Sequence, residues 1–572
     1  MDYKKIVLYA LFIVVALTLW TKWQQEYLRH GSSTTTSTST QQVDHTNKTA
    51  KTATTTSAPS GASNTSASES GSVASVTNTP TKDRLIHIKT DVLDMTIDSL
   101  GGRIVEADLP KYPVALHSDQ AFKLLSYDAA SHYSATAALI GFTDHAIQYH
   151  TANQSYTLAK GQKHLNVVLQ GTSANGLQIS KVFTFTPGSY LVHVSYHIRN
   201  ASTKAQQGRL SLQISRTDVK PSRDGTFRMH AFYGFAISTP ANHYQTFKFS
   251  NLASSNVNLS AKDGWLAMTQ HYFLGAWIPA SGVTYDYFSR VNQNGIYTLG
   301  ANSPTTTIAP GKTVNLNSEF YIGPKIAEIL SSVAPNLSKT IDYGWLWPIS
   351  LLIFWLMKHI FAIIGNWGWS IVIVTAIIKL IFWPLSAKSY RSMAGMRSLQ
   401  PKINALKERV GDDKQQMGRE MMALYKSEKI NPLGGCLPIL VQIPFFIALY
   451  WVLIATIQLR QAPFMFWIHD LSAKDPYYVL PVLMGLSMFL QQKLSPPPPD
   501  PTQAKVMMLL PVFITYIFIH FPAGLILYML VNNLISIGQQ WWITRHYSKG
   551  KYNHKKKASQ WSAKKKADRK KR

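Results

Sequence analysis

The sequence has little cysteine and few acidic residues. Cys436 is the only cysteine among 572 residues, which excludes an internal disulfide and a cysteine-based metal cluster. The 29 acidic residues stand against 57 Lys and Arg, which gives a formal net charge of +28. The sequence also contains no HExxH motif, no nucleophile elbow and no phosphate-binding loop. We therefore predict no enzyme activity, no metal site and no cofactor.

The excess of positive charge is concentrated at the end of the chain. Residues 544–572 contain many Lys and Arg and a single acid, Asp568. A segment of this kind repels itself and binds polyanions, either nucleic acid or anionic lipid headgroups. The alternative is a solvated tail that only fixes the orientation of the preceding segment, because positive segments stay in the cytoplasm.

Apolar segments that can cross a bilayer core of about 30 Å recur along the chain. No small-x-small cleavage site follows the first of them, which predicts an uncleaved signal anchor. We expect six spans with both termini in the cytoplasm, at 1–23, 366–387, 437–458, 478–494, 506–521 and 525–543. The later spans are expected to be joined by an outer loop at 459–477, an inner loop at 495–505 and an outer turn at 522–524.

The connector 325–365 contains another apolar segment that is long enough to cross a membrane. A crossing there would place the basic residues after 387 on the outside, contrary to the positive-inside rule. Trp345, Trp347 and Trp355 suit the membrane surface. We therefore predict an amphipathic helix that lies along the outer interface.

Residues 83–324 show strand-like alternation. HLNVVLQG, SKVFTFTPG and SYLVHVSYHIRN alternate apolar and polar residues and are rich in β-branched and aromatic side chains. Many such segments without helical intervals predict one large all-β sandwich. The preceding residues 24–82 are rich in Ser and Thr and cannot bury a core, so we predict a flexible linker there.

Residues 388–436 are predicted to form a cytoplasmic helical hairpin. Apolar residues recur at steps of three and four, and the segment 411–413 separates two helices. Methionines at several apolar positions suit an adaptable contact surface, although such a stripe is more often the core of the hairpin itself. The candidate contact residues are Met396, Met421, Met422 and Tyr425.

Lys379 is a cation inside the predicted span 366–387, about 9 Å of helix rise from residue 385. A charge at that depth is costly and is a functional hypothesis by default. The alternative is a simple anchor, because a lysine can extend its side chain to the interface. Thr375, one turn earlier, lies on the same helix face.

Polar residues in the other spans favour a functional role for Lys379. Asn532, Ser536 and Gln539 share one face of the last span, and Gln442 lies near the inner end of the third. No acidic residue lies in the apolar part of any predicted span. We therefore predict a positively charged polar groove that attracts an acidic or polar segment of another chain. Hydrogen bonds that only stabilise the bundle remain an alternative for the Asn and Ser side chains.

Long motifs identify a family. MRSLQPKI, EMMALYKSEKINPLGGCLPILVQIPFF, LRQAPFMFWIHDLSAKDPYY and FPAGLILY closely resemble segments of the YidC family of bacterial membrane protein insertases, in its Gram-negative form. The resemblance covers nearly all of the chain. It implies a polytopic α-helical inner-membrane protein with a large periplasmic β-supersandwich and a groove open to the cytoplasm and to lipid. It also implies insertion and folding of nascent membrane proteins, alone or with the Sec translocon, and ribosome docking on the basic tail and cytoplasmic loops.

The resemblance also implies roles for individual residues. It places the substrate groove at Thr375, Lys379, Gln442, Tyr528, Met529, Asn532 and Ser536. It places an apolar slide for the substrate at Phe445, Phe446, Met507 and Met508. Most relatives have arginine at the position of Lys379, and lysine keeps the charge but loses the planar five-donor fork. Relatives often have tyrosine at the position of Met529.

Two other classes of function stay open. Residues 83–324 resemble mutarotase-like sandwiches in shape, so carbohydrate binding or turnover by this part would indicate an enzyme or a sugar-binding module. A proton-coupled transporter would usually need a buried carboxylate, whereas a small-solute channel would not, so the channel is not excluded.

Overall fold

The structure is a computed structural model that describes residues 80–128, 130–143, 145–219, 232–411, 413–428, 437–495 and 501–570. The predicted signal anchor at 1–23 and residues 24–79 of the predicted linker lie outside the described residues. For the end of the chain, beyond residue 546, only the backbone is described.

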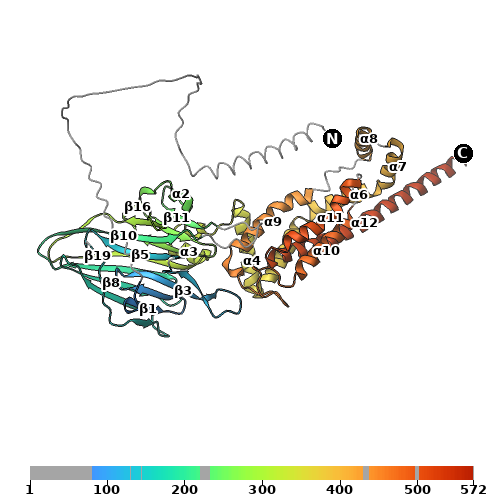
Figure 1. Cartoon of the computed structure of the whole chain (residues 1–572). Helices are drawn as coiled ribbons and strands as arrows, with labels where there is room; N and C mark the ends of the chain where they lie inside the picture. Colours follow the sequence, from blue (N-terminus) through green and yellow to red (C-terminus); the bar gives the residue numbers. More distant parts are fainter. Residues whose placement is uncertain are drawn as a thin grey trace, which may run out of the picture. The chain divides into compact units, whose positions relative to one another are not determined.

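Two β-sheets occupy the first half of the described chain (Figure 1). The larger sheet has 11 strands in the order β13-β16-β17-β10-β5-β3-β2-β1-β6, with β4 beside β3 and β18 beside β10. The smaller sheet has 8 strands in the order β12-β11-β14-β15-β19-β9-β8-β7. The strands are β1 (Leu85–Lys89), β2 (Asp94–Asp98), β3 (Arg103–Pro113), β4 (Ala121–Leu125), β5 (Tyr133–Ile140), β6 (Ser155–Thr157), β7 (Leu165–Thr172), β8 (Leu177–Phe185), β9 (Leu191–Asn200), β10 (Gln206–Thr217), β11 (Gly234–Ser238), β12 (Gln245–Phe247), β13 (Asn258–Lys262), β14 (Trp265–Thr269), β15 (Phe273–Pro279), β16 (Thr284–Val291), β17 (Ile296–Asn302), β18 (Thr306–Ile308) and β19 (Thr313–Pro324).

Alternating burial explains why these segments form strands. In β9 the side chains of Val192, Val194 and Ile198 are buried, whereas those of His193 and His197 are exposed. This is the two-residue period of a strand that has one face in the core and one in solvent. β8 and β9 pair antiparallel in a continuous register, so their apolar side chains reach the same face.

The two sheets pack together through their apolar faces. Trp277 on β15 is fully buried, and its Nε1 donates a hydrogen bond of 3.1 Å to the carbonyl of Gln213 on β10. Tyr133 from the larger sheet and Phe183 from the smaller one lie in the same core. The predicted all-β sandwich is therefore confirmed.

A lysine side chain also lies in this core. Lys181 on β8 is fully buried, and its Nζ donates to the carbonyls of Gly102 at 2.7 Å and Ala137 at 2.9 Å. The rings of Phe183 and Tyr196 lie 5.2 Å and 5.1 Å from Nζ. The carbonyls and the ring faces are electron-rich, so together they replace part of the hydration that the ammonium loses.

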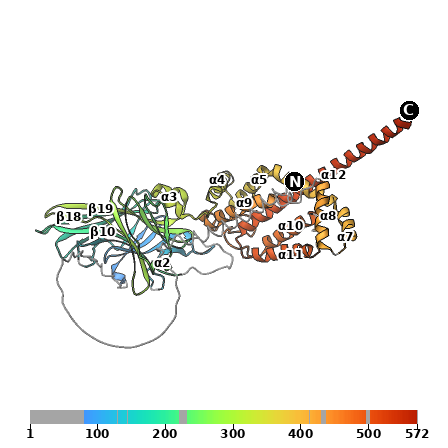
Figure 2. The same ribbon diagram turned by 90° about the horizontal axis from the view of Figure 1, so that it is seen from above.

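Helices dominate the second half. They are α2 (Phe249–Leu252) within the β-region, then α3 (Ala327–Val333), α4 (Trp347–Ile364), α5 (Trp367–Ile381), α6 (Trp383–Ser398), α7 (Gln400–Val410), α8 (Lys414–Ser427), α9 (Leu437–Ala455), α10 (Val479–Leu494), α11 (Pro501–Phe518) and α12 (Ala523–Lys570), with short 3₁₀ turns η1 (Lys82–Arg84), η2 (Leu337–Thr340) and η4 (Ile457–Leu459). α5, α6 and α10 pack against α12, and α4 packs against α9. α7 and α8 pack side by side as a hairpin, which Figure 2 shows from above, and α7 contacts α6.

The predicted span 366–387 is bent in the structure. α5 ends at Ile381, and α6 begins at Trp383 at an angle of 69° to it. Pro384 lies in the first turn of α6, where a missing N–H costs nothing, but inside one continuous helix it would remove a hydrogen bond. The proline therefore explains why two helices form here.

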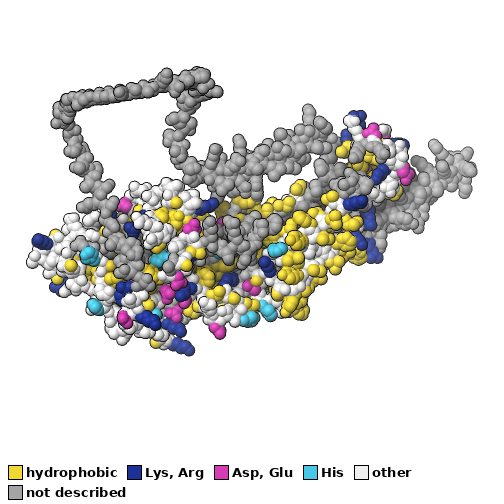
Figure 3. All heavy atoms as spheres, in the orientation of Figure 1, with side chains coloured by type: hydrophobic (Ala, Val, Ile, Leu, Met, Phe, Trp, Pro, Cys, Tyr) yellow, Lys and Arg dark blue, Asp and Glu magenta, His cyan; other side chains and the backbone are white. Residues whose placement is uncertain are grey.

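By length and apolar composition, one described helix, α4, is able to cross a membrane, and the bent pair α5–α6 adds a second if it is counted as one span. Leu440–Ala455, Val479–Leu494 and Ala504–Phe518 are apolar but shorter. Hydrophobic side chains cover much of the visible surface of the helical part (Figure 3). The count of six spans stays a prediction.

Candidate functional site

α5 places Lys379 and Thr375 on its buried face. The helix begins at a side-chain cap, because Asn366 Oδ1 accepts a hydrogen bond of 3.1 Å from the N–H of Trp369. Thr375 is buried, and Lys379, in the last turn, is only 8% exposed. The residues that the sequence placed on one helix face do share it.

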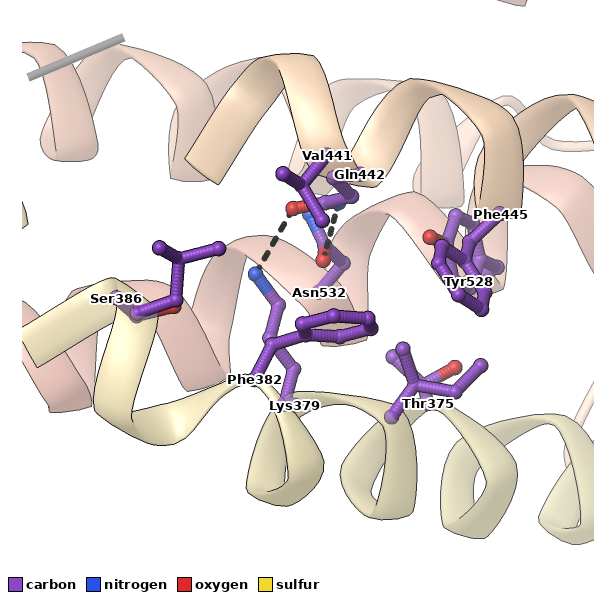
Figure 4. A pocket seen from close by; sticks show the side chains of 11 residues that line it. Thr375, Lys379, Phe382, Ser386, Val441, Gln442, Phe445, Tyr528 and Asn532 are labelled. Atoms are coloured by element: carbon purple, nitrogen blue, oxygen red, sulfur yellow. Dashed lines mark hydrogen bonds between the residues drawn. The ribbon is translucent and has the colours of Figure 1, made fainter. Parts of the chain in front are cut away.

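The Lys379 ammonium bonds to side chains from two other helices. Its Nζ donates to Gln442 Oε1 on α9 at 3.1 Å and to Ser536 Oγ on α12 at 2.8 Å. Gln442 Nε2 in turn donates to Asn532 Oδ1 at 2.5 Å, and Ser536 Oγ donates to the Asn532 carbonyl at 2.7 Å. Figure 4 shows Lys379 pointing from α5 toward Gln442, with Asn532 beside it. Four predicted groove residues therefore form one continuous network.

The charge at this network is not neutralised within the described residues. The partners of Lys379 Nζ are neutral oxygens, and no described carboxylate forms an ion pair with it. A buried cation with only neutral acceptors retains a positive field that an anionic or strongly polar group would relieve. Among the described residues, the acceptors of Lys379 Nζ are therefore polar but uncharged.

A small cavity adjoins Lys379. Its volume is about 20 Å³, room for roughly one water molecule. It is lined by Thr375, Ile378, Lys379, Phe382, Leu385, Ser386, Val441, Gln442, Phe445, Tyr528 and Asn532. The volume is too small for a polypeptide segment in this conformation.

Some lining residues were not identified from the sequence. Ser386 follows Lys379 by seven residues, a spacing that places both on one face of a continuous helix. Because the chain bends between α5 and α6, the two residues do not lie on one continuous helix, and the spacing alone does not predict that Ser386 lines the cavity. Phe382 and Val441 are apolar residues in apolar segments, and nothing in the sequence marks them.

The other predicted groove and slide residues fall into two places. Tyr528 is buried in the cavity wall, and Met529 beside it is half-buried against the core. Phe445 lies 5.1 Å from the ring of Phe382, edge to face, and Phe446 lies 6.1 Å from the ring of Tyr528. Met507 and Met508 lie on α11, outside the cavity lining, and are exposed together with most of its apolar residues.

The predicted hairpin residues also separate. Met396 lies on α6, whereas Met421, Met422 and Tyr425 lie on α8. Met422 is exposed, and the other three are half-buried. Ion pairs between Arg409 and Glu420 and between Lys402 and Glu428 join the two helices of the hairpin. Met422 is therefore the one of these four that presents a free apolar surface.

Comparison with known proteins agrees with this architecture. Residues 85–356 match the family described as "YidC periplasmic domain", and residues 359–551 match "60Kd inner membrane protein". Proteins named "Membrane protein insertase YidC" from Coxiella burnetii (strain Dugway 5J108-111) and Legionella pneumophila (strain Paris) are 43% and 44% identical, each over 96% of this chain and 98% of their own. One from Marinobacter nauticus is 45% identical over 83% of this chain and 86% of its own. The chain therefore belongs to the YidC family of membrane protein insertases.

Proposed function

We propose that this protein inserts and helps to fold integral proteins of the inner membrane, with the Lys379 site as the groove that receives the hydrophilic flank of the substrate. The observation that carries the proposal is the buried ammonium, held only by neutral oxygens from α9 and α12. The names of the relatives support the same activity. No bond is made or broken, so the protein is not an enzyme in this proposal.

The groove acts by exchange of hydrogen-bond partners. An acidic or polar group of the substrate replaces Gln442 and Ser536 as the acceptor for Lys379 Nζ. A carboxylate adds the attraction between opposite charges to the hydrogen bond from the ammonium, so the exchange is favourable for a carboxylate. Because the cavity is small, α5 and α9 separate to admit the substrate.

The driving force is the transfer of apolar substrate surface into lipid. Each Å² removed from water contributes about 25 cal/mol. The exposed apolar side chains of α11, including Met507, Met508 and Phe513, offer a surface along which this transfer proceeds. The half-buried Phe445 and Phe446 link that surface to the groove.

The proposed topology has six spans, both termini in the cytoplasm and the β-domain in the periplasm. An ion pair supports the interfacial position of α4, because Lys358 of α4 bonds to Glu328 of α3, close after the end of the β-domain. Lys358 lies in the second half of α4. Because this contact holds the second half of the helix near α3, most of α4 is kept near the outer surface. Exposed Trp347 and Trp355 suit that position.

The proposed partners are nascent membrane proteins, the ribosome, the Sec translocon and anionic lipid headgroups. The run of Lys and Arg in 544–572 supports the contacts with the ribosome and with lipid, since both present phosphate groups. The exposed Met422 of the hairpin adds an apolar contact surface on the same side.

A crosslinking experiment tests the groove. A photoreactive residue is placed at Thr375, and a short single-span membrane protein is translated on ribosomes in the presence of membranes that contain the variant. We expect a crosslink to the nascent chain that is lost when Lys379 becomes Ala. The matched control carries the photoreactive residue at Leu352, on the exposed face of α4. Insertion without a crosslink at Thr375 would contradict the proposed route.

A further inference from the structure

A second and larger cavity lies at the other end of the helices. Its volume is about 520 Å³. Its walls come from the 459–477 loop between α9 and α10, the α11–α12 turn, the end of α9 and two loops of the β-domain, all within one compact unit. This volume falls in the range of roughly 300–1,000 Å³ that is usual for small-molecule sites.

Basic side chains outnumber acidic ones around this cavity. Arg460, Lys474, His271 and His469 line it, and Asp470 is the one carboxylate among the lining residues. Asp470 Oδ1 is already occupied by the N–H of Gln461 at 3.0 Å and by the N–H and Oγ of Ser472 at 2.8 and 2.7 Å. The acid therefore has hydrogen bonds within the loop, and Arg460 and Lys474 are the Arg and Lys side chains of the lining.

Arg460 is held in position without being neutralised. Its Nη2 donates to the carbonyls of Pro113 at 2.6 Å and Val114 at 3.1 Å, at the end of β3. No described carboxylate forms an ion pair with it, and Nη1 and Nε have no hydrogen bond to the described residues. Partial burial lowers the pKa of Arg460, and the nearby Asp470 carboxylate offsets only part of that effect.

The loop that carries these groups is fixed before any ligand binds. Asp475 is buried and accepts hydrogen bonds from Trp467 Nε1 at 2.9 Å and from the N–H of Leu480 at 2.7 Å. A further hydrogen bond, from the N–H of Phe464 to the carbonyl of Ile468, closes the same loop. A preorganised loop loses little entropy on binding.

Exposed aromatic residues beside the cavity suit a position at the membrane surface. Phe466 and Tyr477, in the same loop, are 76% and 69% exposed. Aromatic side chains gather at the level of the lipid headgroups, where a ring can enter the acyl region while its polar neighbours stay hydrated. The apolar lining from Leu453, Ile454 and Ile468 continues this surface into the cavity.

We propose that this cavity binds the phosphodiester headgroup of a phospholipid from the outer leaflet. Arg460 and Lys474 contact the phosphate oxygens, since guanidinium and ammonium groups are the usual partners of phosphate. The apolar lining accommodates the glycerol and the first carbons of the acyl chains. The inference rests on the outer position of this loop in the proposed topology, but not on the groove at Lys379. Free phosphate shares the headgroup chemistry, so the experiment separates the two.

The test measures binding to the full-length protein in detergent by calorimetry, with no nascent chain present. The probes are a water-soluble short-chain phosphatidylglycerol, a diacylglycerol with the same chains, and inorganic phosphate. We expect saturable one-to-one binding of the phosphatidylglycerol and at least about tenfold weaker binding of the other two. Binding of inorganic phosphate as tight as that of the lipid would overturn the lipid assignment, as would equal binding of the diacylglycerol.

Two substitutions locate the site. Lys474→Gln alters an exposed side chain and should weaken phosphatidylglycerol binding about tenfold without changing the melting temperature. Arg460→Gln should weaken it further, although it also removes the contact to β3. Lys262→Gln, at an exposed position on β13, is the matched control and should bind as the parent does. Unchanged binding by Lys474→Gln and Arg460→Gln would refute the site and would leave insertion through the Lys379 groove untouched.

Discussion

The β-domain and the helical bundle each bury a lysine without a described carboxylate partner, but they hold it in different ways. Lys181 is bonded to the backbone carbonyls of Ala137, on β5, and of Gly102, in the turn before β3. Lys379 is bonded to the side chains of Gln442 and Ser536, on two separate helices. Backbone acceptors cannot leave without disrupting the sheet, whereas side-chain acceptors can rotate away. The kind of acceptor that a buried cation has, more than its burial, therefore decides whether the cation only stabilises the fold or can exchange its hydrogen-bond partners.

The largest expected effect is on the stability of the β-domain as a function of pH. Burial lowers the pKa of Lys181 from 10.5 to about 7, and burial likewise lowers that of Lys325 to about 7. Between pH 7 and 10.5 the unfolded chain holds protons that the folded chain has lost, so the free energy of unfolding rises with pH. Below pH 7 both lysines are protonated in the folded and in the unfolded chain, so their contribution to the pH dependence disappears. We expect a total rise of several kcal/mol, since one pKa unit corresponds to about 1.4 kcal/mol.

Urea denaturation of the intact protein, followed by ¹⁹F NMR of a fluorotryptophan at Trp277, measures this rise. Lys181→Met should remove roughly half of it, because Lys325 still titrates. A free energy of unfolding that stays constant from pH 7 to 10.5 would contradict the assignment of a buried, readily neutralised Lys181.

The second effect concerns insertion. Lys379→Gln should reduce the insertion of a single-span substrate with an acidic flank at least about tenfold, which is roughly 1.4 kcal/mol. Lys379→Arg keeps the charge and should retain most of the activity. Insertion is measured by protease protection of the radiolabelled substrate. If Lys379→Gln inserts as well as the parent, the charge has no role in the groove.

The third expected effect is a difference in stability between two glycine-to-alanine variants, one in the β-domain and one in the helical bundle. Gly102 has φ +59°, and a Cβ there would lie 3.0 Å from Lys181 Cδ and 3.3 Å from Leu169 Cδ1. Gly102→Ala should therefore destabilise the β-domain by about 1–3 kcal/mol. Gly538 on α12 has nothing within 4 Å of an added Cβ, so Gly538→Ala should be neutral or stabilise by up to about 1 kcal/mol. The melting temperature should fall for Gly102→Ala and should stay constant or rise for Gly538→Ala.

The smallest effect is expected at the start of α5. Asn366→Ala removes the side-chain cap on the N–H of Trp369 and the hydrogen bond from Asn366 Nδ2 to the carbonyl of Phe464, and the lost cap should cost about 1 kcal/mol in the first turn of the helix. Hydrogen exchange of the first-turn amides of α5 measures the loss. Lys379 lies three turns away, so insertion should change less than twofold. A large loss of insertion would show that the cap also positions the groove.

Much of the site could be predicted from the sequence because helical spacing is a local rule. The four-residue step from Thr375 to Lys379 fixed their common face, and the amide and hydroxyl side chains at Gln442 and Ser536 were conspicuous in apolar segments. Strand alternation likewise predicted the β-sandwich. Even Lys181 had a signal, since it occupies a buried position between Ile179 and Phe183.

Other features depend on geometry that local rules do not fix. A proline at position 384 is compatible with a kink, a helix end or a helix start, so the sequence alone did not give the 69° bend. The outer cavity needs loops from distant parts of the chain, and Gln461 in its wall has a positive φ angle, which residues other than glycine rarely adopt.

The break between α5 and α6 has a mechanical consequence. A continuous helix would transmit any torque on the cytoplasmic hairpin directly to Lys379, because an α-helix is stiff along its axis. The break at Phe382 interrupts the helix axis, so a rotation of α6 would bend the chain there, while α5 keeps its cap at Asn366. Phe382 is also a wall of the small cavity and touches Phe445. A rotation of α6 about this break would therefore move Phe382, in one wall of the cavity, and would leave Lys379 on α5 in place.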